Sequence, residues 1–155
     1  MFSCKNPEKC RNEMVRRSNI QERFYSQNIE IIKAAQSNKG TRLSMIENSH
    51  SAERENFRMY SRTQLIQAFL KGKMISSSYN KVFGEYRFVL KYSFKTSVDY
   101  ERPIHLIVAT HKSNLLDWTI ITVMDPASRK FKWDDTYENQ ICFCDRNSTL
   151  NYVYN

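Results

Sequence analysis

The segment that most constrains the fold is residues 86–94, YRFVLKYSF, in which the side chains alternate in character. Every second residue is aromatic or aliphatic, and mostly polar residues lie between them. Because successive side chains of a β-strand point to opposite faces of a sheet, this pattern predicts a strand with one buried face. That face would carry Tyr86, Phe88, Leu90, Tyr92 and Phe94.

Further strands are predicted after this segment. Residues 104–110 and 118–124 are mostly apolar and predict two strands. Shorter strands are predicted at 130–133 and around 141–143. Since these segments follow one another with short connections, they favour an antiparallel sheet.

Helical periodicity precedes the strands. Residues 11–36 place apolar side chains at helical spacing and predict one long helix, with Gly40 as the C′ residue beyond its end. A second, shorter helix is predicted to begin with Asn48 or Ser49 as its N-cap and to run through Arg58.

A third helix is predicted between Ser61 and Gly72. Ser61 and Gln64 have the spacing of a capping box, and an apolar stripe follows them. The stripe consists of Leu65, Ile66, Phe69 and Leu70. The order of elements predicts an α+β fold, with N-terminal helices packed on an antiparallel β-sheet of about four strands, in a single domain of residues 1–155.

Charge and hydropathy limit the classes of partner that we expect for this protein. The chain has a net charge of +8, and between residues 54 and 95 nine basic side chains accompany two acidic ones. A basic window of this kind favours an anionic partner, most often nucleic acid. No apolar run approaches the ~20 residues that span a bilayer. We therefore expect a soluble, cytoplasmic protein without a membrane partner.

The four cysteines lie towards the two ends of the sequence, at Cys4, Cys10, Cys142 and Cys144. This placement suggests a metal or disulfide clasp between the ends. In most zinc sites two to four residues separate paired ligands, whereas here five residues separate the first pair and one separates the second. The spacing favours free thiols and no cofactor, with a zinc site formed by the four cysteines as the alternative.

One face of the second predicted helix gathers groups that suit RNA chemistry. His50, Arg54 and Arg58 are four residues apart and share a helical face. Imidazole transfers protons near neutral pH, and the planar guanidinium matches the oxygens of a phosphate. The alternative is an ordinary helix surface, on which His50 caps or packs and the arginines pair with neighbouring glutamates.

Four segments, in this order, carry a resemblance to a known family. They are SHSAERENFR (49–58), LKGK (70–73), RPIHLIVA (102–109) and IITVMDP (120–126). Together they resemble the DUF4258 family, whose opening pattern is a histidine with arginines at +4 and +8. A similar helix occurs in a phage-encoded endoribonuclease of RelE-like fold. The resemblance implies a RelE-like core over residues 46–126, with a helical extension at 1–45 and a C-terminal strand and tail at 127–155.

The resemblance also implies an activity: cleavage of RNA by a small ribonuclease toxin, or a phage or effector nuclease, without a metal. Such cleavage needs a base for the 2′-hydroxyl, an acid for the leaving oxygen and cations for the transition state. His50 is the predicted acid or base, with Arg54 and Arg58 as phosphate clamps. His105 is the predicted second proton-transfer group, and Arg87 is placed by strand alternation to reach a phosphate from the sheet.

Further basic residues are predicted to bind nucleic acid: Arg62, Lys71, Lys73, Lys81 and Lys91. The expected partners are mRNA or ribosome-associated RNA, together with an acidic antitoxin or inhibitor protein. One alternative is a non-catalytic RNA- or protein-binding module of the same fold, in which His105 is a satisfied buried histidine. Another is an interaction protein organised by zinc at its cysteines.

Overall fold

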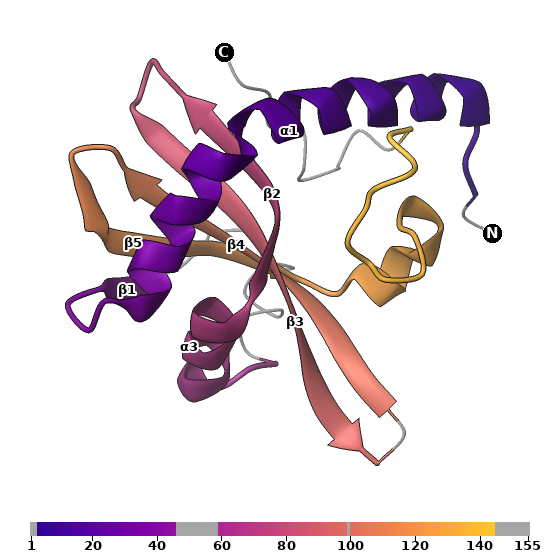
Figure 1. The fold of residues 1–155 in the computed structure, drawn as a ribbon. Helices are drawn as coiled ribbons and strands as arrows, with labels where there is room; N and C mark the ends of the chain where they lie inside the picture. The colour runs from indigo at the N-terminus through magenta and orange to yellow at the C-terminus, as the bar shows by residue number, and fades with distance from the viewer. Residues whose placement is uncertain (1–2, 46–58, 99, 145–155) are drawn as a thin grey trace.

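The computed structural model describes residues 3–45, 59–98 and 100–144. Its elements follow one another as α1 (Pro7–Ser37), β1 (Arg42–Met45), α3 (Arg62–Lys71), β2 (Lys73–Asn80), β3 (Glu85–Ser97), β4 (Tyr100–His111), β5 (Asn114–Met124) and η1 (Pro126–Lys132). Figure 1 shows α1 and α3 against the sheet, and η1 with the segment after it beside the N-terminal half of α1. The architecture is α+β, as predicted. The helix predicted at 48–58 lies outside the described residues.

The strands form one five-stranded sheet in the order β1-β5-β4-β3-β2. The pairs β2–β3, β3–β4 and β4–β5 are antiparallel, as the short connections predicted. The sheet is nevertheless mixed, because β1 pairs with β5 in parallel. The predictions of about four strands and of a purely antiparallel sheet were therefore wrong. Residues 42–45, predicted to belong to a helical extension, form an edge strand.

The alternation in β3 selects the face that packs on the helices. Phe88 and Leu90 pair in register with Val108 and Leu106 of β4, and these four side chains are buried in the same apolar cluster. Tyr86, Tyr92 and Phe94 pack against this cluster from its margin. The predicted buried face of residues 86–94 is confirmed.

Trp118 of β5 lies at the centre of the core. Its ring centroid is 5.5 Å from that of Phe69 in α3 and 5.3 Å from that of Phe88 in β3. Aromatic pairs at such separations add to the stabilisation that their buried area provides. From α1, Ile32 and Ala35 complete the cluster, so both helices are held to the sheet by this one group of side chains.

The capping residues set the bounds of α3. The side chain of Ser61 accepts a hydrogen bond from the Gln64 amide, and the Gln64 side chain accepts one from the Ser61 amide, as the capping box predicts. Gly72 is the C-cap, also as predicted. Leu65 and Phe69 are buried, but Leu70 is exposed, which differs from the predicted stripe.

The helix α1 is 31 residues long, or about 46 Å at 1.5 Å per residue. It ends at Ser37 with Asn38 as its C-cap, so Gly40 is not the C′ residue. The C-terminal half packs on the core. Within α1, no residue between Cys10 and Asn28 is buried, since this half extends past the sheet.

Two predicted strands near the C-terminus were wrong. Residues 126–132 form the 3-10 helix η1, because the Asp125 side chain accepts a hydrogen bond from the Ala127 amide and Pro126 begins the helix. Residues 141–143 form no strand, and only a single bridge joins Trp133 to Gln140. A tight turn connects the two, with Tyr137 at a positive φ of 59°.

Candidate functional site

The structure places some of the predicted site residues and not others. His50, Arg54 and Arg58 lie outside the described residues. The proposed helix face therefore stays a prediction. Among the described residues, His105 and Arg87 are the two further catalytic candidates, and both lie on the sheet face opposite the helical core.

His105 is a buried histidine with a fixed partner. Its side chain is 1 % exposed, and Nε2 lies 2.7 Å from the carbonyl oxygen of Tyr137, to which it donates. The ring packs edge-on against Trp133, with centroids 4.3 Å apart. Burial, aided by the nearby charge of Lys91, lowers the pKa of His105 to about 4, although the hydrogen bond to Tyr137 opposes this shift. Such a histidine holds a loop in place; in this position it does not meet solvent or substrate.

Arg87 is also engaged within the protein. Its Nε donates to Oε1 of Glu85 at 2.8 Å. Both side chains are partly buried, with about 30 % of their surface exposed. A guanidinium in this arrangement can bind a phosphate only by exchanging or sharing its carboxylate partner. The geometry gives Arg87 a structural ion pair on β3.

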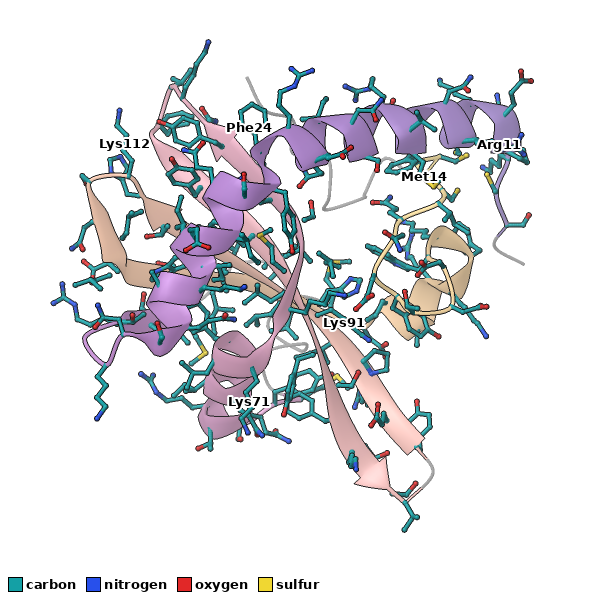
Figure 2. All side chains as sticks on the ribbon, viewed as in Figure 1. Arg11, Met14, Phe24, Lys71, Lys91 and Lys112 are labelled. Atoms are coloured by element: carbon teal, nitrogen blue, oxygen red, sulfur yellow. The ribbon has the colours of Figure 1, made fainter. Side chains whose placement is uncertain are left out.

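The predicted nucleic-acid contacts are spread over the surface. Arg62 and Lys71 mark opposite ends of α3, and Lys81 lies in the turn between β2 and β3. Lys91 lies on β3, in register with Lys73 of β2 and His105 of β4; Figure 2 labels it together with Lys71. Lys73 pairs with Glu138 at 3.1 Å. The structure does not bring these residues into one pocket.

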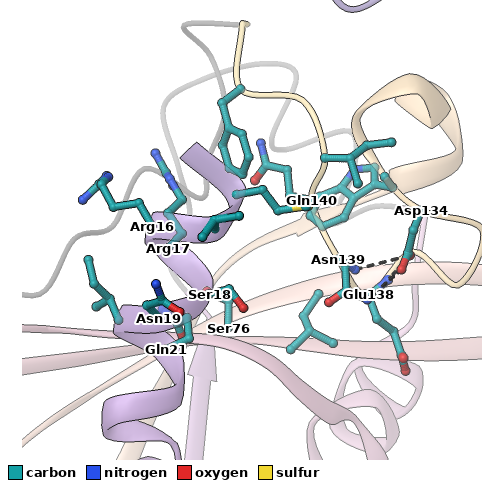
Figure 3. A pocket seen from close by; sticks show the side chains of 17 residues that line it. Arg16, Arg17, Ser18, Asn19, Gln21, Ser76, Asp134, Glu138, Asn139 and Gln140 are labelled. Carbon is teal, nitrogen blue, oxygen red and sulfur yellow. Dashed lines mark hydrogen bonds between the residues drawn. The ribbon is translucent and has the colours of Figure 1, made fainter. Parts of the chain in front are cut away.

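A pocket of about 550 Å³ separates the N-terminal half of α1 from β2 and the 133–143 segment (Figure 3). Sequence reasoning did not find it, because its walls come from segments more than a hundred residues apart. Its charged side chains already have partners: Arg16 and Arg17 bind Glu13, which lowers the pKa of Glu13 to about 2 through those hydrogen bonds. Asp134 accepts from the Thr136 hydroxyl and closes its own turn.

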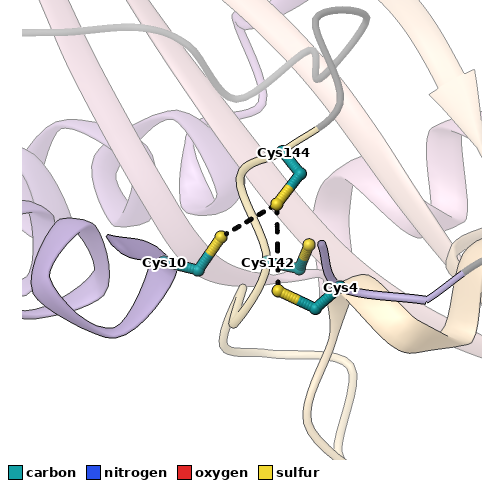
Figure 4. Close-up of side chains that lie close together, drawn as sticks. All are labelled: Cys4, Cys10, Cys142 and Cys144. Atoms are coloured by element: carbon teal, nitrogen blue, oxygen red, sulfur yellow. Dashed lines mark hydrogen bonds between the residues drawn. The ribbon is translucent and has the colours of Figure 1, made fainter. Parts of the chain in front are cut away.

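The four cysteines meet beside this pocket (Figure 4). Cys10 lies in the first turns of α1, Cys4 precedes the helix, and Cys142 and Cys144 follow the turn at the other end of the described chain. Their four Sγ atoms all lie within 4.8 Å of one another. Sγ of Cys144 is 3.3 Å from Sγ of Cys10 and 3.8 Å from Sγ of Cys4. No disulfide joins them.

Backbone amides surround the sulfurs. The Phe143 amide donates to Sγ of Cys10 at 3.2 Å, and the Cys144 amide donates to Sγ of Cys142. Cys144 receives hydrogen bonds from Cys10 and from the amides of Lys5 and Asn6, which lower its pKa to about 6. Burial raises the pKa of Cys10, and raises that of Cys142 to about 12. The cluster thus combines thiol groups with donors that stabilise negative sulfur, as thiolate metal sites require.

We compared the chain with protein families, with curated proteins and with solved structures. No family model, no curated protein and no solved structure matches the chain. Among the described residues, no helix is long and apolar enough to cross a membrane. The resemblance to the DUF4258 family stays a prediction.

Proposed function

We propose that this protein binds RNA through its basic surface and cleaves it as a RelE-like, metal-independent endoribonuclease of the cytoplasm. The observation that carries the proposal is the surplus of positive charge without acidic partners. Within the described part of residues 59–98, five basic side chains take part in none of the ion pairs that the structure forms. They are Arg62, Lys71, Lys81, Lys91 and Lys95.

The placement of these cations supports binding of an extended polyanion. They lie on both ends of α3, on the β2–β3 turn and along β3. Contacts of this kind suit the phosphate backbone, which offers one negative charge at each nucleotide and carries no sequence information itself. mRNA or ribosome-associated RNA is the proposed substrate. An acidic antitoxin or inhibitor would cover the same surface.

The catalytic part of the proposal concerns His50, Arg54 and Arg58. Their spacing supports one proton-transfer group and two phosphate clamps on a helix face. His105 is reassigned to a structural role, holding the turn at Tyr137, because its ring is buried and its Nε2 donates a hydrogen bond to the Tyr137 carbonyl. Arg87 is reassigned to its ion pair with Glu85.

A second candidate function is a binding module without catalysis. The sequestration of His105 and the pairing of Arg87 favour it, since two of the five predicted catalytic groups are occupied within the fold. In this case the basic surface holds RNA or an acidic protein, and His50 has no chemical role.

Binding is tested by fluorescence anisotropy of a labelled single-stranded RNA over a range of salt concentrations. The affinity should fall with salt, and Lys71→Ala and Lys91→Ala should each reduce the salt slope by about one. Lys39→Ala is the matched control, because Lys39 is an exposed lysine outside the basic window. Absence of RNA binding, together with retention on an acidic polypeptide, would instead indicate a protein partner.

Cleavage is tested with the same RNA in a buffer without added divalent cations. We expect His50→Ala to abolish cleavage, His105→Gln to preserve it, and an RNA without 2′-hydroxyls to resist it. Binding without cleavage by the wild-type protein would establish the second candidate. If the wild-type protein neither binds nor cleaves RNA and is not retained on an acidic polypeptide, both candidates fail.

A further inference from the structure

We propose that Cys4, Cys10, Cys142 and Cys144 bind one zinc ion in a closed, tetrahedral structural site. Their spacing in the sequence favoured free thiols, whereas the fold brings all four sulfurs together. This inference is independent of the proposed RNA function, because none of the four cysteines takes part in that proposal.

The distances suit a single metal ion. Tetrahedral zinc holds thiolates at ~2.3 Å, which corresponds to sulfur–sulfur separations of about 3.8 Å. The Cys4–Cys144 separation is 3.8 Å, that of Cys10–Cys144 is 3.3 Å, and every pair lies within 4.8 Å. A disulfide needs sulfurs ~2.05 Å apart, so the cluster fits a mononuclear ion better than a pair of disulfides. A tetrahedral set of four sulfurs selects zinc or iron among the common metals.

The surroundings of the sulfurs resemble an outer coordination shell. Three of the cysteines accept hydrogen bonds from backbone amides, at Phe143 for Cys10, at Cys144 for Cys142, and at Lys5 and Asn6 for Cys144. Such donors orient thiolates and disperse their charge. Because four protein ligands fill the tetrahedron, no position is open to substrate, and the site is structural.

The position of the cluster explains what the metal would hold together. The N-terminal half of α1 extends past the sheet, and between Cys10 and Asn28 the helix has no buried residue. Beside it, the 133–144 segment has little regular structure. One visible contact is the Arg17 guanidinium, 4.6 Å from the centre of the Phe143 ring. Zinc would join the start of the described chain to the 133–144 segment, through Cys4 and Cys10 on one side and Cys142 and Cys144 on the other.

The first test is the metal content of the purified wild-type protein. The full chain is purified under reducing conditions without chelator, loaded with ZnSO₄, desalted and measured by elemental analysis. We expect one zinc per chain. Cobalt loading should give the visible ligand-field bands of a tetrahedral thiolate site, and zinc should remove them. Failure to retain zinc after loading would overturn the proposal, and so would retention of iron in place of zinc.

Ligand variants identify the site. Cys4→Ser and Cys144→Ser are chosen because Cys10 and Cys142 are buried and their substitution can prevent folding. Each should weaken zinc binding by at least the ~10–100-fold that loss of an outer-shell partner costs. Cys144→His should restore binding, since histidine is also a zinc ligand, and Ser3→Ala should leave it unchanged. Full zinc occupancy in both serine variants, with folding checked by circular dichroism, would refute the assignment.

Discussion

The burial of His105 predicts how stability depends on pH. Its pKa lies at about 4 in the folded protein, against an ordinary value of 6.5. Between these values the unfolded chain binds a proton that the folded protein does not bind. The free energy of unfolding should therefore fall as the pH falls through this window. A protonated ring would place its charge in a buried site, close to Lys91 and against the indole of Trp133.

The magnitude follows from the shift. One pKa unit corresponds to ~1.36 kcal/mol, so the whole shift is worth about 3 kcal/mol. Between pH 7 and pH 5 the linkage relation gives a loss of about 2 kcal/mol. At lower pH Glu13 also contributes, because its lowered pKa makes a stabilising interaction that is lost as the carboxylate is protonated. Cys144, whose pKa is lowered to about 6, also loses a stabilising contribution between pH 7 and pH 5, so the contribution of His105 is taken from the difference between the wild-type protein and a variant without this histidine.

Guanidinium unfolding followed by tryptophan fluorescence measures this loss. The variant His105→Gln keeps an N–H donor for the Tyr137 carbonyl but does not titrate, so its stability should change about 2 kcal/mol less over the same interval. His111→Gln is the matched control, because His111 is exposed at the end of β4. Equal pH dependence of the wild-type protein and His105→Gln would refute the reasoning.

Three further variants test the core and the helix caps by the same unfolding measurement. Phe88→Ala should destabilise the protein by about 3–5 kcal/mol, since it opens a cavity beside Trp118; a loss below 1 kcal/mol would contradict the placement of this ring in the core. Ser61→Ala should cost about 1 kcal/mol through loss of the capping hydrogen bond, and Arg62→Ala is its neutral comparison. Gly72→Ala should cost about 1–3 kcal/mol, because the added Cβ would collide with the Ala68 carbonyl and approach the Leu90 Cβ to 2.9 Å; an unchanged stability would show that α3 can shift.

The sequence predicted the elements whose patterns are local. The alternation of residues 86–94, the capping box at Ser61 and the long helical period before Ser37 all depend on neighbours a few positions away. The sequence did not predict the strands β1 and β2. β1 is only four residues long, and β2, KMISSSYN, is rich in serine, which has no strong strand signal. Both strands form because the sheet supplies partners, which periodicity alone does not reveal.

The cysteine cluster was harder to predict than the fold. Spacing in the sequence reveals metal ligands only when they are close in the chain. The Sγ atoms of Cys10 and Cys144 are brought to 3.3 Å by tertiary structure. The turn at Tyr137 directs the C-terminal cysteines back towards α1. Tyr137 has a positive φ there, and its carbonyl accepts a hydrogen bond from His105. Neither feature carries a sequence signal, because tyrosine rarely adopts this conformation.

The separation of the cysteine pairs along the chain has a consequence for synthesis. Cys4 and Cys10 leave the ribosome early, whereas Cys142 and Cys144 follow only after all five strands have been made. Cys4 and Cys10 must therefore remain reduced, without a disulfide, while the sheet forms. A bond between the pairs closes a loop that contains almost the whole described chain, which removes much conformational freedom from the unfolded state. Coordination would thus be the last step of folding, and the supply of metal to the cell would determine how many finished chains complete it.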